Sequence, residues 1–399
     1  MGSRVRASYR YHRCMPLAAA PRNVAVVHEW LVDFAGSERV LEQILSVYPD
    51  ATLYLLIDRM EPALRARFRS RRTVTSFLDR WPRIERYFTR CLPLMPFAMQ
   101  QFDLSGHDLI ISSSHCVAKG VIVPPDALHL CYCHSPMRYV WDMQATYLAQ
   151  EGLDRGVMGW LARHFFHRLR VWDATSHHGV DHFAANSDFV RRRILKCYRR
   201  AASVIHPPVA VDVEPLATVA RDPRHCVTLG RLLGYKNVAL MIEAFRLLPD
   251  WKLTVAGDGP QRNALQAKAP SNVKFLGAVS EAEKQRLLQS ASVFVFAAVE
   301  DFGIAPAESL AAGTPVVALA RGGVLDYLRH GDNAWLFDEP TPEALAQAIR
   351  SASDHWPHDV ADRCRRSVAG LSEACFRTRF SSWVAEKWAE WQRTPNSMS

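Results

Sequence analysis

Short apolar runs alternate with amphipathic stretches along most of this 399-residue chain. Each run is rich in Val, Ile, Leu and Phe at consecutive positions, which is typical of strands buried on both faces of a parallel sheet. The pattern predicts strands at residues 24–28, 52–57, 108–113, 119–123, 129–134 and 182–186, and then at 225–229, 252–256, 272–276, 292–298, 315–319 and 334–337. Strands that alternate with helices predict an α/β fold with two parallel sheets, each wrapped by helices.

The helical pattern divides the chain in the same way. Helices are predicted up to residue 46 and at 237–248, 281–290, 305–312 and 342–353, with a short one after Gly323 and a Trp-rich one near 373–392. An extended, proline-containing segment at 203–214 leads to the linker. We predict a disordered basic extension at 1–22, Rossmann-like domains at 23–208 and 209–370, and, at 371–399, a C-terminal helix that packs back on the first domain, with a tail. A cleft between the domains is the expected ligand site.

Two acids, Glu300 and Glu308, flank the start of a helix that follows an apolar strand. A strand that ends in an acid and turns at Gly303 places Glu300 at the carboxyl edge of the sheet, where open α/β sheets bind ligands. Glu308 lies about one and a half turns into the helix, where it still faces the same crevice. The N–H groups of Phe302, Gly303 and Ile304 lie at the positive end of this helix, which suits an anionic or hydroxyl-rich ligand.

Two cations, Arg231 and Lys236, lie on the loop after the first strand of the second domain, just before a helix. Such a pair beside a helix N-terminus can clamp a diphosphate, since Arg binds in a bidentate manner and Lys acts as a point charge. The alternative is two surface cations that contribute little. The acids on a neighbouring strand edge of the same sheet favour the clamp.

The combined pattern resembles the family 4 retaining glycosyltransferases. It consists of Gly-Arg-x4-Lys-Asn at 230–237, Gly-Asp-Gly-Pro at 257–260, Gly277, and Glu300-x7-Glu308 followed by Gly-Thr-Pro. The resemblance extends from residue 23 to about residue 392 and implies the GT-B fold, two Rossmann-like domains facing a central cleft, with the acceptor on the N-terminal side. The stretches His-Glu-Trp-Leu, Ser-Glu-Arg-Val-Leu-Glu and Cys-His-Ser-Pro-Met-Arg-Tyr most resemble bacterial mannosyltransferases of O-antigen, capsule or exopolysaccharide assembly.

The resemblance implies a nucleotide-sugar donor, with GDP-mannose as the favoured one, and assigns roles to the C-terminal residues. Arg231 and Lys236 neutralise the diphosphate, and Glu308 binds the ribose hydroxyls. The donor sugar's hydroxyls are held by Glu300 with the amides of Phe302 and Gly303, and the backbone near Ala278 and Val279 meets the base.

The N-terminal domain carries a related loop at Ala35-Gly36-Ser37-Glu38 after its first strand. Family members commonly show Gly-Gly-x-Glu there, so one glycine is missing, but Gly36 still allows close approach of the backbone to the diphosphate. We therefore include Gly36 and Ser37 in the donor site. The alternative is a helix capped by Ser37, or a loop selected only for its turn geometry.

A histidine, His134, falls at the carboxyl end of the predicted strand 129–134, followed by Arg138. The resemblance implies that such a histidine contacts the donor sugar near the reacting centre, and Arg138 is predicted on the acceptor side. A structural role for His134 ranks second. A metal site with Cys131 and Cys133 ranks last, because one short cluster gives only three ligands.

The first strand ends in Glu29 and Trp30, beside the expected acceptor side. Either residue could position the acceptor, since aromatic faces suit sugar rings. Equally, Trp30 could simply pack in the core. Nothing in the sequence distinguishes His115 from an ordinary polar residue.

The positive charge lies in the first half, where residues 1–200 hold 28 Lys and Arg against 18 Asp and Glu. Ten arginines between residues 59 and 90 alternate with aromatic residues, which suits an anionic membrane surface. A solvated helix face is the alternative, and no nucleic-acid-binding module accompanies the charge. We expect a cytoplasmic protein, peripheral on the inner face of the cell membrane, without nucleic acid as a partner.

The predicted activity is metal-independent transfer of a hexose, with retention, to a lipid-linked (polyprenyl-diphosphate) or saccharide acceptor, without a cofactor. The cations would stabilise the departing diphosphate, which can itself take the acceptor's proton. Two alternatives stay open: a nucleotide-sugar epimerase or hydrolase of similar fold, and a non-catalytic, membrane-associated assembly partner.

Overall fold

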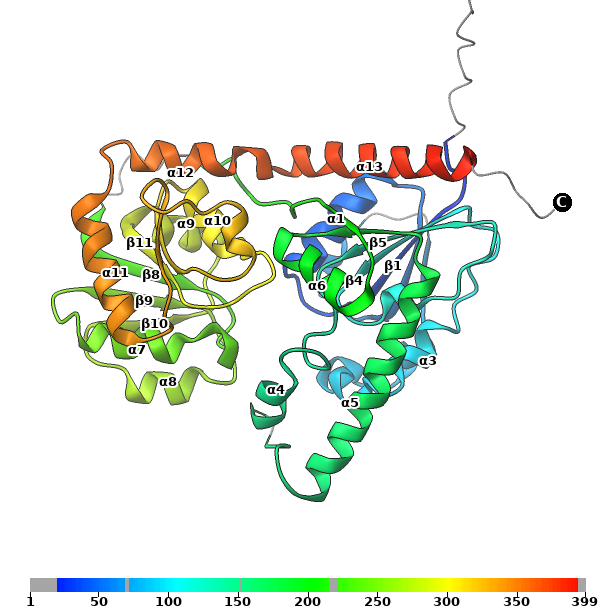
Figure 1. Cartoon of the computed structure of the whole chain (residues 1–399), viewed down its shortest axis with the longest axis horizontal. Helices are drawn as coiled ribbons and strands as arrows, with labels where there is room; N and C mark the ends of the chain where they lie inside the picture. The colour runs from blue at the N-terminus through cyan, green and yellow to red at the C-terminus, as the bar shows by residue number, and fades with distance from the viewer. Residues whose placement is uncertain (1–19, 69–71, 151, 215–220, 394–399) are drawn as a thin grey trace, which may run out of the picture.

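Two parallel sheets form the frame of the protein in a computed structural model that describes residues 20–68, 72–150, 152–214 and 221–393 (Figure 1). The first sheet has the strand order β3-β2-β1-β4-β5-β6-β7, and the second has the order β10-β9-β8-β11-β12-β13. All strand pairs of both sheets are parallel. The predicted α/β fold of two Rossmann-like domains is therefore confirmed.

The strands of the first sheet are β1 Val24–Leu31, β2 Thr52–Asp58, β3 Arg72–Thr75, β4 Leu109–Ser114, β5 Leu128–Cys133, β6 His182–Ala185 and β7 Ala202–Val204. Those of the second are β8 Asp222–Leu229, β9 Lys252–Ala256, β10 Val273–Gly277, β11 Ala291–Phe296, β12 Val316–Leu319 and β13 Ala334–Phe337. The central strand β1 is buried along most of its length, which explains the apolar run at residues 24–27.

The helices that accompany the first sheet are α1 Gly36–Val47, α2 Pro62–Arg65, α3 Met95–Met99, α4 Gln144–Gln150, α5 Gly156–Ser176 and α6 Asp188–Tyr198. Those of the second are α7 Val238–Arg246, α8 Arg262–Lys268, α9 Glu281–Ser290, α10 Ile304–Ala311, α11 Pro342–His355, α12 Val360–Val368 and, after it, α13 Glu373–Arg393. Helix α1 shows why these segments are helical: its buried residues Val40, Leu41, Ile44 and Leu45 recur at helical spacing and form one apolar face.

Both faces of each sheet are covered. In the first domain, α1 and α13 pack on one face, and α3, α5 and the short 3₁₀ turns of residues 77–91 pack on the other. In the second domain, α7 and α11 cover one face, and α9, α10 and α12 cover the other. Each domain thus has its own core on either side of its sheet.

The last helix, α13, returns to the first domain, as predicted (Figure 1). Its residues Phe376, Phe380 and Trp383 are buried against the first sheet. The chain therefore crosses between the domains twice, and Val209 donates its backbone N–H to the carbonyl of Leu371 over 2.9 Å where the two crossings meet. The predicted boundary at residues 208 and 209 lies between β7 and β8 and stays a prediction.

One predicted strand is wrong. Residues 119–123 contain a 3₁₀ turn at Ala118–Gly120 instead of a strand. The amine of Lys119 is buried against the carboxylate of Asp173 in α5, at 2.5 Å, and Gly120 packs against the Trp172 ring, where a Cβ atom would lie 2.3 Å from a ring carbon. Residues 1–19 of the predicted extension lie outside the described residues. Residues 394–399 of the predicted tail lie outside them as well.

Candidate functional site

A cavity of about 620 Å³ lies where the two domains face each other, and both domains line it. The N-terminal wall comes from the start of α1 and the loops after β4 and β5, and the C-terminal wall from the loops after β8 and β11 and the start of α10. All of these segments follow the carboxyl ends of strands or open helices, where α/β folds bind ligands. The predicted site residues that line the cavity are Gly36, Ser37, His134, Arg138, Arg231, Lys236, Glu300, Phe302, Gly303, Ile304 and Glu308.

The C-terminal wall holds an ion pair between Lys236 and Glu300. Lys236 ends a 3₁₀ turn, Gly234–Lys236. The side-chain amide of the next residue, Asn237, donates from Nδ2 to the carbonyl of Ala297 over 2.9 Å, which ties this loop to the end of β11. Although burial opposes the charge, the Glu300 carboxylate raises the pKa of Lys236. Both side chains are largely buried, at 19% and 17% exposure, so a charged amine is fixed at the cavity wall.

Two further groups on this wall are open to a ligand. Arg231 is exposed, and its guanidinium has no hydrogen bond or ion pair among the described residues. The N–H groups of Phe302, Gly303 and Ile304 likewise have no hydrogen-bond acceptor in the described part of the chain. The ring of Phe302 is buried against Tyr327, so this residue offers its backbone to the cavity and its side chain to the core.

Glu308 lies on α10 and is 5% exposed. One of its carboxylate oxygens, Oε1, accepts a hydrogen bond from Lys284 Nζ of α9 over 3.0 Å and forms an ion pair with Arg39 Nη1 of α1 at the same distance. Arg39 comes from the opposite domain, so this ion pair joins the two walls of the cavity.

The N-terminal wall approaches closely at Gly36. A Cβ atom at this position would lie 2.8 Å from Cδ1 of Ile304 on the opposite wall, so the missing side chain allows the contact. The neighbouring Ser37 donates its hydroxyl to Glu38 Oε2 over 3.0 Å, and the same oxygen accepts the backbone N–H of Ala35. Helix α1 is thus held at its start by the buried Glu38.

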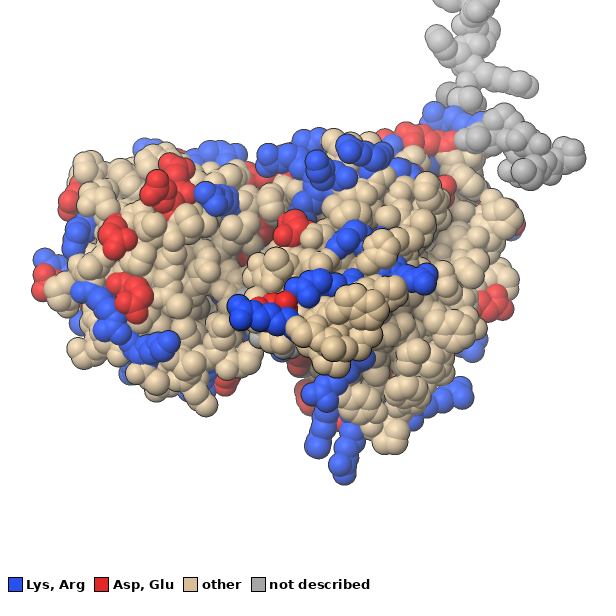
Figure 2. Space-filling model, turned by 60° about the horizontal axis from the view of Figure 1, so that its bottom comes forward, with Lys and Arg blue, Asp and Glu red and all other residues tan. Residues whose placement is uncertain are grey.

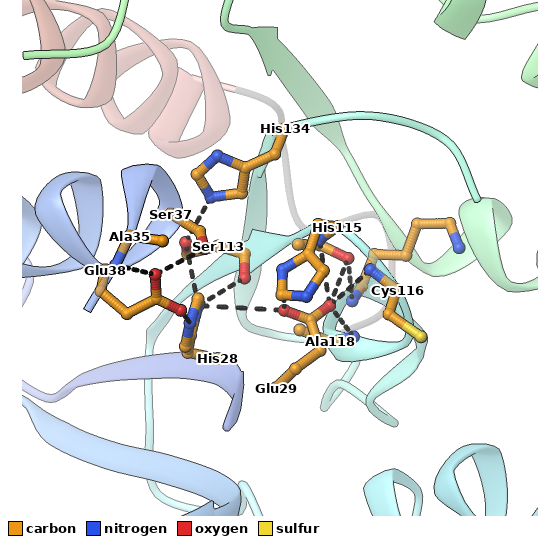
Figure 3. Close-up of polar contacts among 12 residues, drawn as sticks. His28, Glu29, Ala35, Ser37, Glu38, Ser113, His115, Cys116, Ala118 and His134 are labelled. Atoms are coloured by element: carbon orange, nitrogen blue, oxygen red, sulfur yellow. Dashed lines mark hydrogen bonds and ion pairs between the residues drawn. The ribbon is translucent and has the colours of Figure 1, made fainter. Parts of the chain in front are cut away.

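His134 follows β5 and forms a 2.9 Å hydrogen bond between its Nε2 and the hydroxyl of Ser113 (Figure 3). Burial lowers the pKa of His134, and the charges of His115 and His28 lower it further, to about 3. Its imidazole is therefore neutral at the cavity wall. Cys131 and Cys133 pack on a separate apolar cluster, and the described residues contain no group of three or more His, Cys, Asp or Glu side chains arranged to hold a metal ion.

Arg138 crosses between the domains instead of pointing to an open acceptor side. Its guanidinium donates to Asp301 Oδ2 over 3.0 Å and to the carbonyl of Val299 over 3.2 Å. It also lies over the ring of Tyr235, 5.1 Å from the ring centre. The structure therefore gives Arg138 a domain-bridging position that the sequence did not indicate.

Glu29, predicted on the acceptor side, is instead fully buried and does not line the cavity; Figure 3 draws the polar contacts that hold it. Its Oε1 accepts the hydroxyl of Ser114 and the backbone N–H groups of His115, Cys116 and Ala118, at 2.8 to 3.1 Å. Glu29 holds the loop after β4 and does not reach the cavity.

Trp30 and Val279 also lie outside the cavity lining. Trp30 packs against Phe88 and the edge of the His115 ring, at 5.1 and 4.8 Å between ring centres, which corresponds to the packing alternative. Val279 is half-buried in the loop between β10 and α9, and its predicted contact with the base stays a prediction.

Sequence reasoning missed three groups of the site: His115, Asp301 and Arg39. His115 follows β4 as His134 follows β5, so the strand-end rule that found His134 could have found it. Asp301 is adjacent to Glu300 in the motif. The sequence around Arg39 contains no pattern that indicates a site residue, since Arg39 reaches Glu308 only because α1 packs near α10 in the folded protein.

Comparisons with known proteins agree with this geometry. Residues 212–367, which include the whole second sheet, match the family model described as "Glycosyl transferases group 1". The chain is 28% identical over 210 residues to the D-rhamnosyltransferase WbpZ of Pseudomonas aeruginosa, covering 48% of this chain and 55% of that protein. It is 33% identical over 189 residues to a GDP-mannose-dependent alpha-(1-6)-phosphatidylinositol dimannoside mannosyltransferase of Mycobacterium tuberculosis, covering 43% and 49%. The chain thus spans about half the length of these curated relatives.

Solved structures extend the similarity to almost the whole chain. The sucrose-phosphate synthase of Thermosynechococcus elongatus matches with a TM-score of 0.70 at 17% identity, over 92% of this chain and 100% of that one. HepE of Anabaena in complex with UDP matches with a TM-score of 0.66 at 15% identity, over 91% and 99%. The protein therefore has the GT-B fold, and its second domain matches the group 1 glycosyl transferases.

Proposed function

We propose that the protein is a retaining glycosyltransferase that moves a hexose from a nucleoside diphosphate sugar. The observation that carries the proposal is the cavity between the domains, in which Arg231, Lys236, Glu300 and the start of α10 converge on one wall. Two cations beside free N–H groups at a helix start suit a diphosphate. The carboxylate of Glu300, next to them, suits the hydroxyls of the attached sugar.

The chemistry follows from these positions. As the sugar leaves, negative charge grows on the diphosphate, and Lys236, Arg231 and the N–H groups at residues 302–304 stabilise it. Because the protein itself supplies this positive charge, we propose that transfer needs no metal ion. Glu300 is not a nucleophile in this scheme, since the departing phosphate takes the acceptor's proton on the same face of the sugar. His134, neutral and held by Ser113, donates or accepts a hydrogen bond at the sugar.

GDP-mannose is the proposed donor. The support is the similarity to a mycobacterial GDP-mannose-dependent mannosyltransferase and to a D-rhamnosyltransferase, together with the N-terminal motifs quoted above. HepE was solved with UDP, so UDP-sugars are the first competitors to test. The proposed acceptor is a saccharide or a polyprenyl-diphosphate-linked saccharide in surface polysaccharide synthesis.

We also propose that the N-terminal domain docks on an anionic membrane at the inner face of the cell membrane. Arg80, Arg83, Arg86 and Arg90 are exposed on the segment that packs beside α3 and α5. Figure 2 shows this side of the molecule, where blue basic side chains border uncharged surface with few acidic ones over this domain. Exposed apolar side chains on the same elements are Leu94, Phe97, Val157, Met158, Trp160 and Leu161. Among the described helices, none is long and apolar enough to cross a membrane.

Donor screening tests the proposal. The purified protein is incubated with GDP-mannose, UDP-glucose or ADP-glucose and a bacterial lipid extract, and the products are followed by mass spectrometry. We expect one hexose to be added to a lipid-linked acceptor, with GDP-mannose preferred, without change on addition of EDTA, and with strong loss in Glu300→Gln. Donor consumption without any glycosylated product indicates an epimerase or hydrolase instead. No donor consumption and no thermal stabilisation by any donor contradict an enzymatic role.

A further inference from the structure

His115 lies between a buried carboxylate and the cavity (Figure 3). Glu29 holds the loop that carries His115, because its Oε1 accepts hydrogen bonds from three backbone N–H groups within residues 115–118. The other oxygen, Oε2, lies 3.1 Å from Nδ1 of His115. The side chain of His115 is 27% exposed, while that of Glu29 is completely buried. One nitrogen of the imidazole therefore faces the carboxylate, and the ring itself forms part of the cavity wall.

The charged neighbours of His115 favour its protonated form. A buried carboxylate needs a positive partner, and His115 is the histidine nearest to Glu29 Oε2, since Nδ1 of His28 lies at 3.8 Å and also faces the carbonyl of Ser113 at 3.0 Å. Glu38 on α1 lies behind His28, 3.5 Å from its Nε2. His134 is the remaining titratable neighbour, 6.2 Å away between ring centres.

The pKa values agree with this geometry. Burial raises the pKa of Glu29, but His115, His28 and the backbone N–H groups outweigh it, so the pKa lies below its usual range. Burial opposes the charge on His115, yet the Glu29 carboxylate raises its pKa above the ordinary value. The two cavity histidines thus differ: His115 is charged under conditions in which His134 is neutral.

The second ring nitrogen, Nε2, has no hydrogen-bond partner among the described residues. Nδ1, in contrast, is buried, and its partner is the Glu29 carboxylate at ion-pair distance. An imidazolium with a free N–H at a cavity wall is a donor for an oxyanion, and charge-assisted hydrogen bonds are the strong ones.

We propose that His115 is an anion-binding residue of the cavity, held as an imidazolium by Glu29 and donating from Nε2 to a phosphate group. Glu29 is a positioning residue, since it acts through His115. The inference rests on the proposed function, because it adds an N-terminal cation to a site whose proposed diphosphate clamp, Arg231 and Lys236, lies on the C-terminal wall. The phosphate can belong to the donor diphosphate or to a diphosphate-linked acceptor, which share this chemistry.

Calorimetric binding at pH 7.5 separates the two sources. The probes are GDP for the donor, farnesyl diphosphate for the acceptor, and inorganic diphosphate as the shared group. For His115→Gln we expect about tenfold weaker binding of inorganic diphosphate and of one of the other two probes, which identifies the source. The matched control is His178→Gln, which replaces an exposed histidine outside the cavity and should change affinity less than twofold.

A direct readout addresses the role of Glu29. The His115 ring signal is titrated by NMR in the full chain, and Glu29→Gln should lower its pKa and weaken diphosphate binding at pH 7.5. Should Glu29→Gln fail to fold, His115→Gln alone still decides the matter. The proposal is overturned if His115 titrates at or below the ordinary histidine value, if His115→Gln binds all probes within twofold of wild type, or if no probe binds. Because no transfer is measured, an inactive enzyme that still binds diphosphate through His115 refutes only the proposed function.

Discussion

The two walls of the cavity are built in different ways. Behind the N-terminal wall, His28, Glu29 and Glu38 are buried and bonded to the chain around them, so their positions do not depend on a ligand. On the C-terminal wall, Lys236 and Glu300 bind each other, and Arg231 has no partner among the described residues. The first wall is therefore pre-organised by folding, whereas the second keeps charges that an incoming ligand can take over. Substitutions of the buried residues behind the first wall should act mainly on stability, and substitutions on the second wall mainly on turnover.

The largest expected effect follows removal of Lys236, the largely buried cation of the C-terminal wall. Lys236→Ala should lower the rate of transfer by about 10²–10³-fold, because the fixed charge that we propose to stabilise the leaving group is lost. Steady-state kinetics with the identified donor measure it. The matched control is Lys252→Ala, which removes an exposed lysine paired with Asp222 and should leave the rate unchanged. A rate within threefold of wild type for Lys236→Ala would contradict a role of this wall in catalysis.

The next effect belongs to the buried residues behind the N-terminal wall. Glu29→Ala should lower the free energy of unfolding by about 3 kcal/mol, since three backbone N–H groups, two of them buried, and the hydroxyl of Ser114 lose their acceptor. Urea unfolding measures it. Glu42→Ala, which breaks a partly exposed pair with Arg67, serves as the control and should cost less than about 1 kcal/mol. Equal losses for both variants would mean that burial does not distinguish these carboxylates.

A pH series sharpens the same contrast. His134 stays neutral when folded, with its pKa lowered to about 3, so the unfolded chain takes up a proton first as the pH falls below about 6.5. Stability should therefore fall by about 1.4 kcal/mol per pH unit for this group between about pH 6 and 4, and His134→Gln should remove that part of the slope. His115 titrates above this window because its pKa is raised. The same slope in His134→Gln and wild type would show that His134 is not held neutral.

The smallest effect concerns the ion pair that joins the walls. Arg39 is 26% exposed in its contact with Glu308, so Arg39→Ala should change the free energy of unfolding by less than about 1 kcal/mol. Nucleotide affinity should change by less than threefold, because Lys284 still holds Glu308. Arg191→Ala, which breaks an exposed pair with Asp188 within one domain, is the control for stability. A tenfold change in affinity would make Arg39 part of the binding machinery.

The sequence was informative where one local rule decides the outcome. The strands at 252–256 and 334–337 and the helix at 281–290 have the predicted bounds, because an apolar run or a capped amphipathic stretch determines each of them. The rule that sheets bind ligands at carboxyl strand ends also placed Glu300 and His134 at one cavity, although their roles stay predictions.

The failures share a different cause. Residues 119–123 have strand-like composition, but a buried ion pair with Asp173, far along the chain, holds their first residue in a turn. Glu29, like His134, was predicted at the carboxyl end of a strand and therefore near the cleft. In the structure, however, the loop after β4 covers it. Helix α5 was not predicted as a separate element, since its apolar residues are spread around its surface. In each case the local structure depends on contacts with residues that are distant in sequence, and no local sequence pattern indicates those contacts.

The position of α13 has a consequence for engineering. Because this helix completes the first domain, the second domain is inserted into the first, and the hydrogen bond between Val209 and Leu371 places both ends of the insert side by side. A segment whose ends are adjacent can be exchanged for a homologous one without a new linker design. Under the proposed function, chimeras that replace residues 210–370 and keep α13 should therefore change the donor preference and leave the first domain unchanged.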